Sequence, residues 1–310
     1  MRSLAEDVSF ANGGLTLAGT FTTVESPRAA ALLIAGSGET DRDSNTPKLR
    51  LGLTVAIAEA LQAASISSLR FDKRGVGACD GKRGGVTDNL ADARAALAWL
   101  AERTSGLPLF AVGHSEGALH AAELAADGGL TGVVLLSAGA RCGEDILLWQ
   151  AQKIAATLPA IVRVLARATP ERLPATQGKK FARIRASSTD FMRIQGQRIN
   201  ARWLREYLDY DPTPALSRIA VPVLAITGGH DMQVPPDGLE AIRRLVQGSC
   251  TTYRLEALSH LLRPDADSKG PRAYRQAVRQ PVDPRLLELV VDWISSIASG
   301  PPTPVDRVSG

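Results

Sequence analysis

The chain has 310 residues, of which 45% are hydrophobic and 22% are charged, and its formal net charge is +4. This composition favours one large globular domain, or a core with an insertion, with enough apolar residues to bury a core. We expect no membrane-spanning segment, because no stretch reaches the roughly 20 uncharged apolar residues that a span requires. We also expect no signal peptide, because no apolar run follows the N-terminal arginine.

The N-terminal half of the chain alternates between short apolar runs and longer helical patterns. Residues 8–21 are different, because the Asn12-Gly13-Gly14 turn predicts an antiparallel hairpin there. The expected strands that follow are residues 30–36, 65–72, 107–113 and 132–139, and the expected helices are 53–64, 88–103 (capped by Thr87 or Asp88) and 118–126. Such alternation is typical of a parallel sheet with crossover helices.

The alternation stops after residue 140 for about 75 residues. Residues 141–215 are predicted to form a helical cap or lid, with helices at 144–168, 181–199 and 200–210 and a Pro/Gly/Lys break at 168–180. Residues 141–205 hold thirteen Lys or Arg but only four Asp or Glu. Such a segment can attract an anionic substrate, a phospholipid surface or nucleic acid. More often, a basic segment of this kind is simply a helical surface whose arginines are solvated.

The alternation resumes with strands expected at 221–229 and 251–258, a helix near 237–247, and a closing helix with Asp283 as N-cap and Pro284 at its first position. We therefore predict an α/β fold with a mostly parallel central sheet, flanked by helices, and an inserted helical cap. The core would comprise residues 1–140 and 216–298. Residues 299–310 are expected to form a disordered tail.

Three cysteines (Cys79, Cys142 and Cys250) lie far apart, without a C-x-x-C pair or the spacing of metal ligands. An odd, scattered set indicates reduced thiols, so we expect a cytoplasmic protein that requires neither metal nor cofactor. The basic segment carries no interleaved aromatic residues and no nucleic-acid-binding module, so nucleic acid is not expected as a partner.

The pattern Gly113-His114-Ser115-Glu116-Gly117 matches G-x-S-x-G. Alone this motif is a weak signal, but here it lies between a predicted strand and a predicted helix, the context in which the serine becomes an exposed nucleophile. Ser115 is therefore the candidate nucleophile.

A serine hydroxyl needs a base, and the base needs an orienting acid. Of the four histidines, His114 is adjacent to Ser115 on a tight turn and His120 falls in the following helix, whereas His260 follows the last predicted strand. Asp231 also follows a strand, and open parallel sheets place their sites at the carboxyl ends of strands. The predicted triad is Ser115, Asp231 and His260, in the chain order of α/β hydrolases. Asp211 is the alternative acid.

An acyl-transfer enzyme also needs backbone N–H groups directed at the developing oxyanion. We expect one donor at Glu116, the residue after the nucleophile, and the second at Ser37 in the glycine-containing loop after strand 30–36, with Gly38 as its rival.

Five stretches of the sequence resemble the α/β-hydrolase superfamily, and most closely its bacterial esterase-like branch, which is grouped with serine aminopeptidase-type hydrolases. They are GSGETDRDSN (36–45), RFDKRGVGACDG (70–81), GHSEG (113–117), GGHDMQVPP (228–236) and LSHLL (258–262). The resemblance covers about residues 28–140 and 203–298. It implies activity on simple esters and structural, loop-bracing roles for Asp41, Arg42, Asp43, Arg70, Asp72 and Arg74. Cys79 stands where related turns often have serine.

The predicted function is hydrolysis of a small-molecule carboxylic ester of small to medium acyl chain through an acyl-enzyme. One alternative within the same chemistry is a thioesterase, whose anionic coenzyme A leaving group the basic cap would favour, or a peptidase. Another is a non-catalytic binding protein on the same fold. A cap that docks on a membrane to reach lipid is a third, although the apolar pattern of residues 146–167 equally suits a helix packed over a core. The sequence leaves the substrate and the oligomeric state open.

Overall fold

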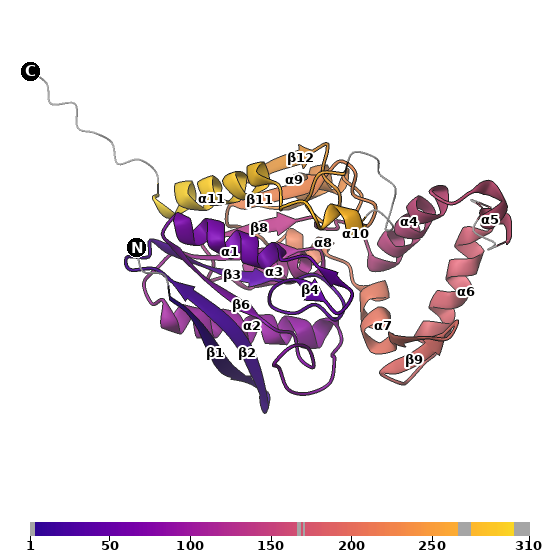
Figure 1. The fold of residues 1–310 in the computed structure, drawn as a ribbon, viewed down its shortest axis with the longest axis horizontal. Coiled ribbons are helices and arrows are strands. Elements are labelled where there is room, and N and C mark those ends of the chain that lie inside the picture. Colours follow the sequence, from indigo (N-terminus) through magenta and orange to yellow (C-terminus); the bar gives the residue numbers. More distant parts are fainter. Residues whose placement is uncertain (1–3, 166–168, 170, 266–273, 301–310) are drawn as a thin grey trace, which may run out of the picture.

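The computed structural model describes residues 4–165, 169, 171–265 and 274–300. Its central element is an eight-stranded sheet (Figure 1), with strands β1 (Leu4–Asn12), β2 (Leu15–Thr23), β3 (Ala29–Ile34), β6 (Ile66–Phe71), β7 (Leu109–His114), β8 (Gly132–Leu136), β11 (Val223–Gly228) and β12 (Cys250–Leu255). The spatial order is β1-β2-β6-β3-β7-β8-β11-β12. β2 pairs antiparallel with both of its neighbours, and the strands from β6 to β12 are mutually parallel. The predicted fold class and the N-terminal hairpin are confirmed.

Helices cover both faces of the sheet, and the central strands β3, β6, β8 and β11 are therefore buried along their whole length. On one face α1 (Leu53–Ala63) and α11 (Pro284–Ala298) pack together, and both contribute to one apolar cluster, with Leu61 and Val290 among its members. On the other face lie α2 (Val86–Arg103), α3 (Glu116–Asp127) and α9 (Gly238–Leu245). Two apolar clusters, one on each face, form the core.

Two helix starts test the capping predictions. Asp283 caps α11 as expected, since its carboxylate accepts hydrogen bonds from the amides of Arg285 (2.9 Å) and Leu286 (3.2 Å). The prediction for α2 was wrong, because the helix begins at Val86 after Gly85. Asp88 lies one turn inside, where its side chain accepts a hydrogen bond of 3.0 Å from the Gly85 amide. It therefore supports the first turn without being the cap residue.

The segment between β8 and β11 projects from the core at the right of Figure 1. It contains α4 (Gly143–Ala156), α5 (Ala160–Leu165), α6 (Leu173–Arg185), the hairpin β9 (Phe191–Ile194) and β10 (Gln197–Asn200), α7 (Ala201–Asp209) and α8 (Thr213–Leu216). The expected helix 144–168 is interrupted near Pro159, which lacks an N–H group. The boundaries predicted for core and cap remain predictions.

The helix predicted at 181–199 was wrong. α6 begins at Leu173, inside the expected break, and ends at Arg185, and residues 191–200 form a hairpin instead. The turn residues Gln195 and Gly196 have φ of 48° and 79°, the left-handed conformation that closes a two-residue hairpin turn. The missed signal was a Gln-Gly pair between two short runs that each contain an Arg-Ile pair.

Two further expectations concern the chain as a whole. Among the helices of the described residues, none is long and apolar enough to cross a membrane. Of the expected tail 299–310, residues 301–310 lie outside the described part. β4 (Asn45–Thr46), β5 (Leu49–Arg50) and α10 (Tyr274–Ala277) complete the elements of the described residues.

Candidate active site

Four strands of the parallel sheet deliver the predicted site residues to one edge. Ser37 follows β3, Ser115 follows β7, Asp231 follows β11 and His260 follows β12. The strands run parallel, so their carboxyl ends lie on the same side of the sheet, and residues far apart in the chain become neighbours.

Ser115 occupies a strained turn between β7 and α3. Its φ and ψ are 57° and −118°, a backbone conformation that residues other than glycine rarely adopt. The surrounding glycines make this turn possible. A Cβ on Gly113 would lie 2.0 Å from the Gly117 oxygen, and a Cβ on Gly117 would lie 2.2 Å from the Ile34 oxygen. The Ser115 amide also donates to the Leu136 oxygen at 2.9 Å, which ties the turn to the end of β8.

Asp231 and His260 form a buried pair. The distance between Asp231 Oδ2 and His260 Nδ1 is 2.8 Å, and the two side chains are 0% and 4% exposed. Burial by itself would raise the pKa of Asp231. The charge and hydrogen bond of His260, together with the amides of Val234 and Gln233, outweigh burial and hold that pKa below its usual range. The aspartate is therefore suited to orient the imidazole and to stabilise its charged form.

Asp231 contacts Nδ1 of His260, so Nε2 is the ring nitrogen that the predicted triad assigns to the serine. In the described part of the chain no hydrogen bond joins His260 to the Ser115 hydroxyl. The two residues are nevertheless held close together, because the ring of His114, next to Ser115, lies 4.9 Å from the His260 ring. Catalytic hydrogen bonds are often long in the absence of substrate and tighten when it binds.

The amides of Ser37 and Glu116 have no acceptor among the described residues. Both residues line the same cavity as Ser115. Gly36 brings its loop against the nucleophile, since a Cβ there would lie 3.5 Å from the Ser115 Cβ. These two N–H groups are thus available to an oxyanion. The Gly38 amide also lacks an acceptor among the described residues, but Gly38 does not line the Ser115 cavity.

Sequence reasoning missed what the Glu116 side chain does. This carboxylate is buried and accepts hydrogen bonds from Asn89 Nδ2 (3.0 Å) and Trp203 Nε1 (2.6 Å), and Lys73 Nζ lies 3.4 Å away. Burial would raise the pKa of Glu116, but the Lys73 charge, with His120 and Trp203, lowers it well below the usual range. The available signal was a lysine placed just after β6, at the same edge of the sheet.

The cavity at Ser115 has a volume of about 200 Å³ and lies between core and cap. Its lining combines apolar and polar side chains: Ser37, Ser115, Glu116, Ile146, Leu147, Gln150, Trp203, Tyr207, Gln233 and Val234. A second cavity of about 270 Å³ shares Ser37 and Trp203 with it and is bordered by Arg83 and Arg198. The cap therefore helps to define what can bind.

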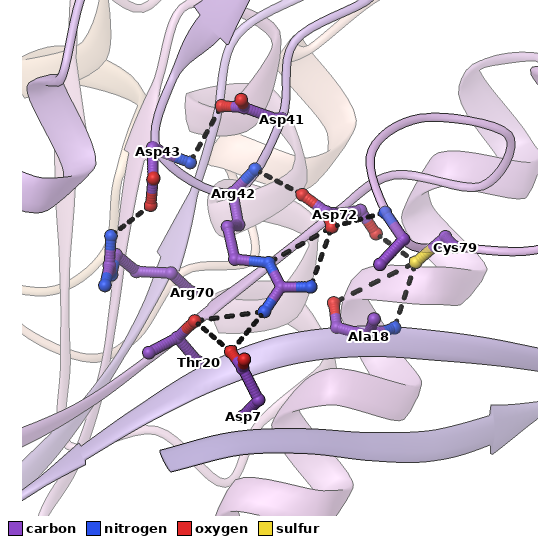
Figure 2. A network of polar contacts seen from close by, with 10 residues as sticks. Asp7, Ala18, Thr20, Asp41, Arg42, Asp43, Arg70, Asp72 and Cys79 are labelled. Atoms are coloured by element: carbon purple, nitrogen blue, oxygen red, sulfur yellow. Dashed lines mark hydrogen bonds and ion pairs between the residues drawn. The ribbon is translucent and has the colours of Figure 1, made fainter. Parts of the chain in front are cut away.

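Charged residues brace the loops that follow β3 and β6 (Figure 2). Arg42 donates to the buried Asp72 through Nη2 (2.8 Å) and Nε (3.1 Å), and its Nη1 reaches Asp7 at 3.0 Å. Arg70 pairs with Asp43 in the same region. The contacts agree with the structural roles expected for these residues.

Cys79 belongs to the same network. Its thiol donates to the main-chain oxygen of Asp72 at 2.9 Å, and its sulfur accepts from the Ala18 amide at 3.0 Å (Figure 2). Burial raises the pKa of this thiol to about 11. Cys79 is thus a buried hydrogen-bonding group of this network and not an activated nucleophile.

The alternative acid is not part of the site. Asp211 is exposed, and its carboxylate accepts from the amide (2.9 Å) and hydroxyl (2.6 Å) of Thr213. In the described residues, no group of three or more His, Cys, Asp or Glu side chains could hold a metal ion.

The sheet order and the strand-end position of these residues define an α/β hydrolase. The chain belongs to the serine aminopeptidase S33 family, whose sequence model matches residues 50–267. Esterase EstD of Thermotoga maritima is 24% identical over an alignment of 277 residues that covers 86% of this chain. The chain spans 62% of the length of that relative.

Solved structures with low sequence identity share the fold. Est1E of Butyrivibrio proteoclasticus, determined with ferulic acid bound, is 17% identical with a TM-score of 0.61, covering 94% of this chain and 99% of its own. The Pyrococcus furiosus esterase Pf2001 is 13% identical with a TM-score of 0.61, covering 95% and 91%. Proline iminopeptidase of Mycobacterium smegmatis is 15% identical with a TM-score of 0.62, covering 95% and 99%.

Proposed function

We propose that this chain is a serine hydrolase that cleaves carboxylic esters of small to medium acyl chain through an acyl-enzyme. The observation that carries the proposal is the buried Asp231–His260 hydrogen bond of 2.8 Å beside a serine on a strained turn. A buried aspartate directed at a histidine, next to two amides without acceptors, suits acyl transfer. The esterase name of the Thermotoga maritima relative agrees with it.

In the proposed reaction Ser115 Oγ attacks the ester carbonyl carbon while His260 Nε2 accepts the hydroxyl proton. The tetrahedral oxyanion is stabilised by the amides of Ser37 and Glu116, each worth about 100- to 1000-fold in rate. The bond to the alcohol then breaks, and His260 returns the proton to the leaving oxygen. Water attacks the acyl-serine with His260 as base, and the acid is released.

The shape of the cavity supports a compact ester. A volume of about 200 Å³, lined by Ile146, Leu147, Val234 and the aromatic residues of α7, suits an apolar acyl group of limited length. An aminopeptidase would need a carboxylate for the substrate's amino group. Of the described lining residues, Glu116 is the only carboxylate, and its oxygens already bind Lys73, Asn89 and Trp203.

A thioester with an anionic leaving group is the second candidate, favoured by the basic border of the neighbouring cavity. Arg83 and Arg198 both lie over the Phe191 ring, at 5.2 and 4.3 Å from its centroid. Arg83 pairs with Glu39, whereas among the described contacts Arg198 has no carboxylate partner. Arg198 is exposed and could meet a phosphate.

The test is hydrolysis of a chain-length series of p-nitrophenyl esters, beside acyl-coenzyme A thioesters and aminoacyl amides, by the parent and by Ser115→Ala. The proposal expects ester turnover that the substitution abolishes, with an optimum at short to medium acyl chains, and labelling of Ser115 by a fluorophosphonate. A preference for thioesters would favour the second candidate. An inert parent that the probe does not label would reject acyl transfer and favour a binding protein on the same fold.

A further inference from the structure

We infer that the buried pair Lys73–Glu116 positions the oxyanion hole by fixing the two loops that supply its amides. This inference rests on the proposed function, since it assigns to the Lys73 and Glu116 side chains the positioning of the amides that would bind the oxyanion. Lys73 and Glu116 act as positioning residues, through the Gly36–Ser37 peptide on one side and the Ser115 turn on the other.

Lys73 contacts both loops at once. Its ammonium group donates a hydrogen bond to the main-chain oxygen of Gly36 and lies 3.4 Å from Glu116 Oε2. The lysine and glutamate side chains are 10% and 2% exposed. Because the pair is nearly free of competing water, its interactions are stronger and its geometry is better defined than those of a surface pair.

The contact with Gly36 orients the next amide. In a planar trans peptide the C=O and N–H bonds point in opposite directions. When Lys73 binds the Gly36 oxygen, the Ser37 N–H must therefore point away from Lys73. Ser37 lines the Ser115 cavity, and a Cβ on Gly36 would lie only 3.5 Å from the Ser115 Cβ, so the cavity is available to that N–H. A rotation of this peptide would withdraw the donor.

The second donor is attached to the other half of the pair. The backbone N–H of Glu116 is the predicted first oxyanion donor, and the side chain of the same residue is held by Lys73, Asn89 and Trp203. Trp203 belongs to α7 in the cap, and its hydrogen bond to Glu116 Oε1 is 2.6 Å long. The carboxylate thus fixes the nucleophile turn relative to the oxyanion loop and to the cap.

Stability alone does not account for such a pair. Replacing a buried ion pair with neutral groups of similar size is often neutral or stabilising, because desolvation of two charges opposes their attraction. A pair that touches both halves of an oxyanion hole has a second consequence, which is to prevent the donors from reorienting during the reaction.

The experiment compares the parent with Lys73→Met, Glu116→Gln and the double variant, using the best p-nitrophenyl ester. Lys73→Met is expected to lower kcat by about ten- to a hundredfold with KM within about twofold, because the oxyanion exists only in the transition state. The kcat of Glu116→Gln should fall less, since the amide oxygen of the glutamine can still accept hydrogen bonds from Trp203 and Asn89. Lys48→Met is the matched control, because Lys48 is exposed in the β4–β5 turn.

Two further measurements separate positioning from loss of fold. The double variant leaves no buried unpaired charge, so it should unfold at a temperature close to that of the parent while keeping the low kcat of Lys73→Met. A trifluoromethyl ketone, which adds to Ser115 and forms an oxyanion, should lose affinity in parallel with kcat, whereas the product acid should not.

A kcat of Lys73→Met within twofold of the parent, or a change in KM alone, would reject the role of the pair while leaving the proposed function intact. Inhibitor affinities that fall equally for ketone and acid would also reject it. If the parent has no esterase activity and Ser115 resists labelling, the proposed function itself fails, and the inference fails with it.

Discussion

The Nε2 atom of His114 lies 2.9 Å from the main-chain oxygen of His260, so the residue before the predicted nucleophile hydrogen-bonds the loop that carries the predicted base. Burial, and then the charge of His260, lowers the pKa of His114 to about 3. His114 is therefore neutral at physiological pH and can donate one N–H to that oxygen. The x position of the G-x-S-x-G motif thus connects serine and base across 146 residues of chain.

Replacing His114 with leucine should therefore leave the loop that carries His260, the proposed base, less firmly positioned. Loss of one buried hydrogen bond of about 1 kcal/mol predicts a fall in kcat of roughly five- to tenfold. His114→Gln, which keeps a side-chain N–H donor, should retain most of the activity. Steady-state kinetics across pH provide the check: His114→Gln should leave the acid limb of the profile in place, and a displaced limb would mean that His114 itself titrates during catalysis.

The two candidate acids can be compared directly. Asp231→Asn is expected to lower kcat by about 10³- to 10⁴-fold, because an amide favours the wrong tautomer of the histidine and no longer stabilises its charged form. Asp211→Asn should leave kcat within about twofold, since Asp211 is exposed and contacts Thr213. Activity measured with the same ester decides between them, and equal losses would disprove the assignment of the acid.

The depressed pKa of Asp231 also predicts how stability depends on pH. A carboxyl whose pKa is lower in the folded than in the unfolded state adds stability that is fully present above its unfolded value of about 3.9 and is lost as pH falls through the folded value. Urea unfolding of the parent and of Asp231→Asn should therefore differ less at pH 3 than at pH 7. A difference that grows on acidification would contradict the sign of this shift.

Gly117 tolerates no side chain. A Cβ there would lie 2.2 Å from the Ile34 oxygen, a main-chain atom that cannot rotate away, so Gly117→Ala should destabilise the fold by about 1–3 kcal/mol or more. Gly178 in α6 is the matched control, because its Cβ would meet nothing within 4 Å and alanine is the better helix former by about 0.5–1 kcal/mol. Denaturant unfolding should show opposite signs for the two substitutions.

Arg42 neutralises a buried carboxylate. Asp72 is 3% exposed, and Arg42→Met would leave it charged without its cation, at a cost of about 3–5 kcal/mol in the free energy of unfolding. Arg94→Met breaks an exposed pair with Asp127, in which the side chains are 47% and 42% exposed, and should cost less than about 1 kcal/mol. Similar losses for both variants would show that Asp72 finds other partners.

The sequence was sufficient to predict the features that depend on hydrophobic periodicity and on the position of residues at the ends of strands. The alternation of apolar runs and helical patterns predicted the parallel sheet, and the position of Ser115, Asp231 and His260 after strands predicted that they lie at one edge. The hairpin at 191–200 was missed because its two four-residue strands stand beside strong helix patterns, and only the Gln195-Gly196 turn breaks the helical period. The Glu116 partners were missed because Lys73, Asn89 and Trp203 come from three elements that only tertiary packing brings together.

The position of the cap in the chain has a consequence for biosynthesis. β8 and β11 pair side by side in the sheet, yet the whole cap lies between them in sequence. A ribosome therefore releases β7, which precedes the proposed nucleophile Ser115, long before β11 and β12, which precede the proposed acid and base. The pairing of β8 with β11 closes a long loop, and such non-local pairing forms slowly because its entropic cost is high. A nascent chain that already displays Ser115 would thus remain without acyl-transfer chemistry until its last strands dock, so that the activity would switch on only when the sheet is complete.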